Sequence, residues 1–259
     1  MILLLDIGNT HAHVGLGTPT RVLRTHDLPT DDVVAGNLAR NLARLYPGLV
    51  LAGASVASVV PRATQPAVHA LARMCQGPTL LLSPSTLRGL AIDYPRPSTI
   101  GQDRLANALA AFHRFGSPVV VVDFGTAVTF DVVSPGGAYV GGVIAPGLSA
   151  MTDYLHEKTA LLPRIRISEP RSPIGRSTRQ AMLVGAVHGY RGLVRQVVAE
   201  LRSELGHPDL PVVATGGYAA LIARRLPEIS AVAPNLTLEG LRILWNLHHP
   251  PKKTLTTTG

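Results

Sequence analysis

LLLDIGNTHAHVGL, residues Leu3–Leu16, opens the chain, and VVVVDFGTAVTFDVV, residues Val119–Val133, repeats its pattern near the middle. Each stretch begins with an apolar run, which predicts a buried strand. Each run ends in Asp, one further residue and Gly, and a second apolar stretch follows a small hydroxyl residue. We therefore predict two equivalent units, each made of a strand, a tight turn and a returning strand.

The residues at these two turns suit the binding of phosphate. Glycine lets backbone N–H groups approach a phosphate closely, and Thr10 and Thr126 add hydroxyl donors. A carboxylate at a strand end, such as Asp6 or Asp123, can hold a cation that offsets the phosphate charge. A single Asp-x-Gly more often marks an Asx turn. Two copies at equivalent places indicate a duplicated fold with a phosphate site between its halves.

Composition narrows the class of protein. The 259 residues are 46% apolar, which is enough for a substantial core, and no run approaches the roughly 20 apolar residues of a membrane span. The start, MILLLD, lacks the basic leader of a signal peptide. Cys75 is the single cysteine, which excludes an internal disulfide and argues against a cysteine-rich zinc site. We expect a cytoplasmic protein with no membrane partner.

The net charge of +8 first suggests nucleic acid. However, the arginines are scattered, and aromatic residues make up only 4% of the chain. A solvated basic surface explains such a charge without a binding groove, so we expect no nucleic-acid partner.

Elsewhere strands and helices alternate, which indicates an α/β architecture. We expect a short strand at 21–24, one helix at 33–45, and a proline-rich loop at 93–100 that leads into a helix ending near residue 115. Asp103 opens this last helix and can be its N-cap, in which case helix N–H groups would lower the carboxyl pKa. Three more residues have a structural interpretation. Arg104 would make a surface ion pair, and Thr178 would cap a helix through its hydroxyl. Asp131, on the returning strand of the second hairpin, would be either exposed to solvent or a cation ligand.

The two hairpins resemble the phosphate-binding hairpins of the acetate kinase/sugar kinase/Hsc70/actin superfamily. D-I-G-N-T early in the chain, D-F-G-T-A-x-T-F-D midway, the G-Q-D-R element and G-G-V-I-A-P-G resemble the type III pantothenate kinases in particular. This resemblance covers nearly the whole chain. It implies an α/β, duplicated ribonuclease H-like (actin-like ATPase) fold with mixed sheets flanked by helices. The two lobes would span 1–115 and 116–259, with a nucleotide cleft between them and a frayed tail from about residue 249.

The resemblance also implies site residues. Asp103 would be the catalytic base, Asp6 would organise Mg²⁺ through water, and Asp123 would bind a monovalent cation, K⁺ or NH₄⁺. The residues expected to bind pantothenate are Tyr94, Gly101, Gln102, Asp103, Arg104 and Thr178. Those expected to bind ATP are Asp6, Ile7, Gly8, Asn9, Thr10, His11, Ala12, His13 and Thr126.

His11, Ala12 and His13 depart from the small polar residues that the family more often carries at these places, which bears on the details of ATP contact. The implied activity is ATP-dependent phosphorylation of pantothenate to 4′-phosphopantothenate, the first step towards coenzyme A, by a homodimer. Two alternatives stay open: a phosphotransferase or nucleotide hydrolase of the same fold with another acceptor, and a non-catalytic regulatory homologue.

Overall fold

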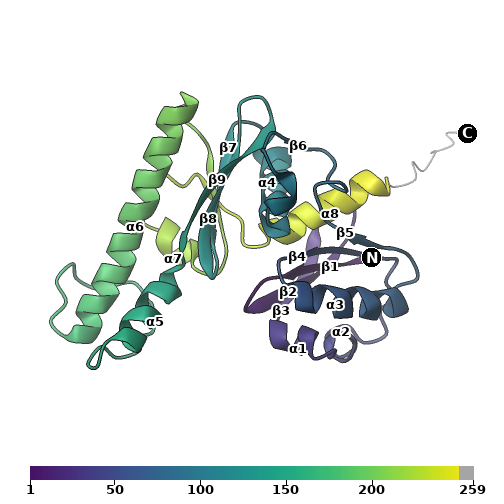
Figure 1. Cartoon of the computed structure of the whole chain (residues 1–259), viewed down its shortest axis with the longest axis horizontal. Coiled ribbons are helices and arrows are strands. Elements are labelled where there is room, and N and C mark those ends of the chain that lie inside the picture. The colour runs from purple at the N-terminus through teal and green to yellow at the C-terminus, as the bar shows by residue number, and fades with distance from the viewer. Residues whose placement is uncertain (251–259) are drawn as a thin grey trace, which may run out of the picture. The chain divides into compact units, whose positions relative to one another are not determined.

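The computed structural model describes residues 1–250 and divides into two compact units (Figure 1). The first unit comprises Met1–Ala91, Arg96–Ala110 and the chain from Thr237 onward, and the second comprises Ile92–Pro95 and Ala111–Leu236. The predicted frayed tail begins at about residue 249, and its residues after 250 lie outside the described part of the chain. No helix in the described part is long and apolar enough to span a bilayer.

A five-stranded sheet forms the centre of the first unit, in the order β3-β2-β1-β4-β5. β1, β2 and β3 pair antiparallel, whereas β4 and β5 run parallel to β1. The strands are β1 (Ile2–Ile7), β2 (His11–Gly17), β3 (Val22–Pro29), β4 (Ala54–Ser58) and β5 (Thr79–Leu81).

Helices cover this sheet on both faces. Leu3, Leu5 and Ile7 of β1 share a core cluster with Ala63 and Ala67 of α3, so the helices before and after β4 bury one face. The opposite face meets the closing helix, because a side chain added at Gly15 would touch Leu238. The helices are α1 (Thr30–Val34), α2 (Leu38–Leu45), α3 (Pro61–Met74), α4 (Gln102–Phe115, which continues into the second unit) and α8 (Leu236–His248).

The second unit is built on a six-stranded sheet in the order β11-β10-β7-β8-β9-β6. β7, β8 and β9 pair antiparallel, and β10 and β11 run parallel to β7. The strands are β6 (Ala91–Ile92), β7 (Val119–Phe124), β8 (Ala127–Val133), β9 (Ala138–Pro146), β10 (Val212–Thr215) and β11 (Ala231–Val232).

The long helix α6 packs on one face of this sheet, where Val187 and Tyr190 join a core cluster with Val122 and Phe124 of β7. It begins at a serine cap, Ser177, and ends at Gly206, whose φ of 64° suits a helix C-terminus. The helices of the second unit are α5 (Leu148–Lys158), α6 (Thr178–Leu205) and α7 (Ala219–Ala223), whereas the short 3-10 helix η1 (Pro97–Thr99) belongs to the first unit.

The two sheets share one topology, which confirms the duplicated ribonuclease H-like fold expected from the two hairpins. β3-β2-β1-β4-β5 of the first unit corresponds strand for strand to β9-β8-β7-β10-β11 of the second, with the same parallel and antiparallel neighbours. β6 is an extra edge strand beside β9.

Three local predictions differ from the structure. The helix expected at 33–45 is two helices, because the chain turns at Gly36 with a φ of 78°. The strand expected at 21–24 extends to Pro29 along β2. The closing helix, which the division at residue 115 assigned to the second lobe, belongs to the first unit from Thr237 on, since Thr237 donates to the Asn107 side chain at 2.8 Å.

Candidate active site

The first phosphate hairpin joins β1 to β2. Asp6 lies one residue before the end of β1 and is only 7% exposed, whereas Asn9, Thr10 and His11 at the turn are exposed. The N–H of Gly8 donates to the His11 carbonyl at 3.0 Å, which closes the turn. The hairpin therefore places a closed turn with exposed residues beside a buried carboxylate, an arrangement that can bind a phosphate together with its cation.

The side chains expected at this hairpin divide between core and surface. Ile7 and Ala12 are fully buried in the sheet's core, so only their backbone atoms can face a nucleotide. The His13 ring lies 2.5 Å from the carboxylate of Asp27, its neighbour on β3. His13 is thus engaged with the adjacent strand, while His11 at the turn is exposed.

The second hairpin joins β7 to β8 and is one residue shorter. Four residues separate the last paired positions of the first hairpin, Ile7 and Ala12, whereas three separate Phe124 and Val128. Asp123 again lies one residue before the strand's end, and Thr126 at the turn is exposed.

Two glycines from distant segments pack against this second turn. A side chain at Gly147, after β9, would overlap the carbonyls of Gly125 and Thr126, and the Gly147 N–H donates to the Thr126 carbonyl at 3.1 Å. At Gly216, where φ is 88°, an added Cβ would lie 2.5 Å from Asp123 Oδ1. Gly147 and Gly216 therefore let two loops close tightly around Asp123 and the turn.

Asp131 of β8 is fully buried, so the prediction of a solvated strand residue is wrong. The hydroxyls of Tyr139 and Thr129 donate to its two carboxylate oxygens, each at 3.3 Å. Buried carboxylates are expected to have such partners. The Tyr139 ring also meets Tyr94 edge-on, with 6.2 Å between ring centroids.

Tyr94, expected at the pantothenate site, is half-buried within the second unit. Its ring covers Gly141, where an added Cβ would lie 3.2 Å from a ring carbon. The neighbouring Asp93 N–H donates to the Tyr139 carbonyl at 2.9 Å. β9 therefore fixes the place of Tyr94, which explains one glycine of the G-G-V-I-A-P-G segment.

The G-Q-D-R element opens α4 in the first unit. The Asp103 carboxylate accepts the Arg104 N–H at 2.8 Å, and an added Cβ at Gly101 would lie 2.5 Å from the same oxygen. Gly101 thus leaves room for the carboxylate. Because α4 begins at Gln102, Asp103 is its second residue and not its N-cap, so the capping prediction is wrong.

Burial raises the pKa of the Asp103 carboxyl above its ordinary value of 3.8, and the Arg104 N–H and guanidinium offset this only in part. The lowered pKa expected from capping is therefore also wrong. A raised pKa makes the carboxylate a stronger base, which suits removal of a proton from an attacking hydroxyl.

Gln102 ties this element to the first hairpin through β4. Its side-chain carbonyl accepts the Ser58 N–H at 2.8 Å, and Ser58 pairs with Ile7 across the parallel strands β4 and β1. The Val59 N–H then donates to the Ile7 carbonyl at 3.0 Å. Within the first unit, the structure thus connects the candidate base and the phosphate hairpin through three short segments.

Thr178, the remaining predicted substrate contact, is the first residue of α6 and is exposed. The helix is capped by Ser177, whose hydroxyl accepts the Gln180 N–H at 3.3 Å. The capping interpretation of Thr178 is therefore wrong, which leaves its hydroxyl available for another role.

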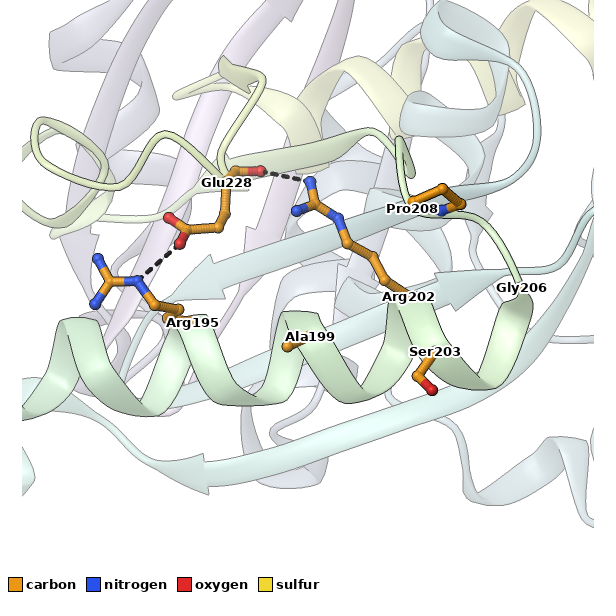
Figure 2. Close-up of a pocket in the computed structure, with 7 residues that line it drawn as sticks. All are labelled: Arg195, Ala199, Arg202, Ser203, Gly206, Pro208 and Glu228. Carbon is orange, nitrogen blue, oxygen red and sulfur yellow. Dashed lines mark hydrogen bonds and ion pairs between the residues drawn. The ribbon is translucent and has the colours of Figure 1, made fainter.

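A cavity of about 530 Å³ lies elsewhere, along the C-terminal half of α6 (Figure 2). Glu228 accepts from Arg195 at 2.7 Å through its carboxylate and from Arg202 at 3.4 Å through its backbone carbonyl. Arg195 is thus paired with the Glu228 carboxylate, whereas Arg202 donates to a neutral carbonyl, and none of the predicted site residues lines the cavity.

The carboxylates present fit the cations that a kinase needs. Asp6 and Asp123 each lie beside the turn of one hairpin, and no group of three potential metal ligands occurs within residues 1–250. Mg²⁺ in nucleotide sites is commonly held by one or two carboxylates together with substrate phosphates and water. One carboxylate per hairpin meets that requirement without a protein-only cage.

The chain is similar to known proteins over nearly its whole length. Residues 2–200 match the family profile described as type III pantothenate kinase. A protein of that name from Akkermansia muciniphila is 48% identical over 247 residues, covering 95% of this chain and 98% of the relative. Another from Methylacidiphilum infernorum is 41% identical over 244 residues, covering 94% and 87%.

A solved structure of a ROK family glucokinase from Streptomyces griseus, in complex with glucose and AMPPNP, superposes with a TM-score of 0.54. The identity is 15%, and the match covers 94% of this chain and 98% of the glucokinase. At that identity the likeness concerns the fold alone.

Proposed function

The chain belongs to the type III pantothenate kinase family, and on this premise we propose that it transfers the γ-phosphate of ATP to pantothenate, yielding 4′-phosphopantothenate. The observation that carries the proposal is the Asp103 carboxylate, whose pKa is raised by burial. Gln102 and Ser58 connect it to the phosphate hairpin.

Asp103 acts as the base that orients and deprotonates the attacking hydroxyl of pantothenate. Phosphoryl transfer passes through a loose transition state that depends chiefly on positioning and on compensation of charge. Arg104 supplies positive charge next to the base. Tyr94, Gly101, Gln102 and Thr178 complete the proposed pantothenate site.

The two hairpins bind the ATP phosphates through backbone N–H groups and the hydroxyls of Thr10 and Thr126. Mg²⁺, held through water by Asp6, supplies charge compensation for the phosphates when it is bound. Asp123 holds a monovalent cation, K⁺ or NH₄⁺. Without that cation its carboxylate would add like charge beside the triphosphate.

We also propose that the chain forms a homodimer in the cytoplasm, with no nucleic-acid partner. Six large hydrophobic residues that are exposed lie between residues 144 and 174, and Tyr154, Leu161 and Ile174 are more than 60% exposed. Exposed apolar residues in such number favour a protein interface, and a second copy is the occupant expected from the family.

The test is ADP release by purified protein, with and without pantothenate, in potassium and in sodium buffer. Release that needs both pantothenate and potassium is expected, and Asp123→Asn should lose the potassium stimulation while it keeps the fold. Release without pantothenate would indicate a nucleotide hydrolase or another acceptor. A folded protein that releases no ADP would favour a non-catalytic homologue.

A further inference from the structure

Thr30 was expected only within a helix N-cap at residues 29–32, but it contacts the first hairpin twice. Its hydroxyl donates to the Gly8 carbonyl at 2.7 Å, and its backbone N–H donates to the Thr10 carbonyl at 3.1 Å. The residue is 1% exposed. Both contacts are therefore made inside the protein, behind the exposed turn.

The position of Thr30 in α1 does not account for these contacts. It is the first residue of that helix, where a threonine hydroxyl commonly makes a hydrogen bond within the helix. Pro29 is the N-cap, and it makes no side-chain cap hydrogen bond. Instead of satisfying a helix N–H, the Thr30 hydroxyl donates to a carbonyl 22 residues earlier in the chain.

Because the peptide group is planar, these two contacts determine the direction of the neighbouring backbone N–H donors. In a trans peptide the C=O and the following N–H point in opposite directions. The Gly8 carbonyl shares its peptide plane with the Asn9 N–H, and the Thr10 carbonyl shares its plane with the His11 N–H. Because both carbonyls point at Thr30, both N–H groups point away from it, and they belong to two residues that are exposed.

We infer that Thr30 is a positioning residue that aims the Asn9 and His11 N–H groups at a phosphate of ATP. This inference rests on the proposed function of the hairpin. At the second turn the Gly147 N–H makes the corresponding bond to the Thr126 carbonyl, and Gly147 and Gly216 pack directly against the loop. The hydroxyl contact of Thr30 with the Gly8 carbonyl is the feature that the first turn has in addition.

The test compares Thr30→Val, which removes the hydroxyl at nearly constant volume, with Thr30→Ser, which retains it. Loss of one neutral hydrogen bond corresponds to about a threefold to tenfold change. Thr30→Val should therefore raise the KM for ATP by about that factor and leave the KM for pantothenate unchanged, and Thr30→Ser should restore the value. Thr86→Val is the matched control, since its hydroxyl donates to the Leu81 carbonyl at 2.8 Å, away from the hairpin.

Binding of Mg²⁺ and a non-hydrolysable ATP analogue, measured by calorimetry on the same variants, separates this inference from the kinase assignment. Weaker analogue binding by Thr30→Val than by Thr86→Val supports the inference even if pantothenate proves not to be the acceptor. Equal binding by wild type and Thr30→Val overturns it, as does an equal rise in both KM values. If Thr30→Val does not fold, Thr30→Ala is measured in the same way and decides by the same outcomes.

Discussion

At the scale of single residues, the burial of Asp103 bears on the base that we propose. Burial raises the pKa of its carboxyl above 3.8, and a base must be ionised to accept a proton. We therefore expect kcat/KM to fall with decreasing pH through a value above 3.8, with no such acid limb in any residual activity of Asp103→Asn. Asp209→Asn, an exposed carboxyl, should keep the wild-type profile. An unchanged profile in Asp103→Asn would remove this residue from the mechanism.

The raised pKa of Asp103 also predicts whether Asp103→Asn stabilises or destabilises the folded protein. A carboxyl whose pKa is raised on folding stabilises the folded state below its unfolded pKa, and this stability is lost as the pH rises through the folded value. At pH 7, Asp103→Asn therefore removes an ionised carboxylate that burial disfavours. Its Tm should equal or exceed that of wild type, while Asp103→Asn loses most turnover.

Gly101 is expected to act through the position of Asp103. An added Cβ would lie 2.5 Å from Asp103 Oδ1, so Gly101→Ala must displace the carboxylate. A displacement near 1 Å can cost about 10²-fold in rate, so kcat should fall by that order with ATP binding unchanged. Gly185→Ala is the control, because a side chain there meets nothing within 4 Å. Full activity in Gly101→Ala would mean that the room left by Gly101 is not needed to position the Asp103 carboxylate.

At the scale of elements, a buried ion pair holds the segment between α5 and α6. Arg191 of α6 is 4% exposed and donates to both oxygens of Glu169, at 3.0 and 2.7 Å. That hydrogen bonding lowers the pKa of Glu169, so the pair stabilises the protein above the unfolded pKa, and this stability is lost as the pH falls through the lowered value.

Glu169→Gln should accordingly destabilise the second unit by about 1.5–3 kcal/mol, because it removes charge-assisted hydrogen bonds from a buried guanidinium that keeps its bonds to the Leu221 and Ile222 carbonyls. Chemical denaturation at pH 7 measures the change. Asp153→Asn, which removes an exposed pair with Arg164 at 3.8 Å, should change the unfolding free energy by less than about 1 kcal/mol. Equal effects of the two substitutions would mean that burial of the Arg191 pair does not matter.

The elements predicted from sequence were those with strong local signals. The first strands of both hairpins carry clear apolar patterns, and the structure has β1 and β7 at these places. β3 was predicted too short because most of its side chains are exposed; its pairing with β2 determines its length. The break between α1 and α2 depends on the left-handed conformation of Gly36, which a helical pattern around it conceals.

In the candidate site, too, residues within local patterns could be predicted, and residues placed by long-range contacts could not. Residues with a role inside one motif, such as Asp6, Asp103 and Asp123, could be selected from sequence. Thr30 and Ser58 could not, because their contacts join segments 22 and 44 residues apart and neither belongs to a recognisable pattern. The burial that shifts the Asp103 pKa likewise depends on packing, and local capping rules predicted the opposite sign.

At the scale of the whole molecule, the proposed homodimer makes a separate prediction. Tyr154→Asp and Leu161→Asp, at side chains 61% and 89% exposed, should produce monomers in sedimentation experiments by placing charge in an apolar interface. Val50→Asp, which is 61% exposed in the first unit, should remain dimeric. A monomeric wild type, or dimers in all three variants, would contradict an interface on this part of the second unit.

The proposed reaction transfers phosphate from ATP to pantothenate with Asp103 as base. The most direct measurement is phosphorus NMR of the reaction of purified wild type and Asp103→Asn with Mg-ATP and pantothenate in potassium buffer. We predict a phosphomonoester resonance of 4′-phosphopantothenate that grows with ADP in the wild type and is nearly absent in the variant. Inorganic phosphate in place of the ester, or equal ester formation by both proteins, would contradict the account.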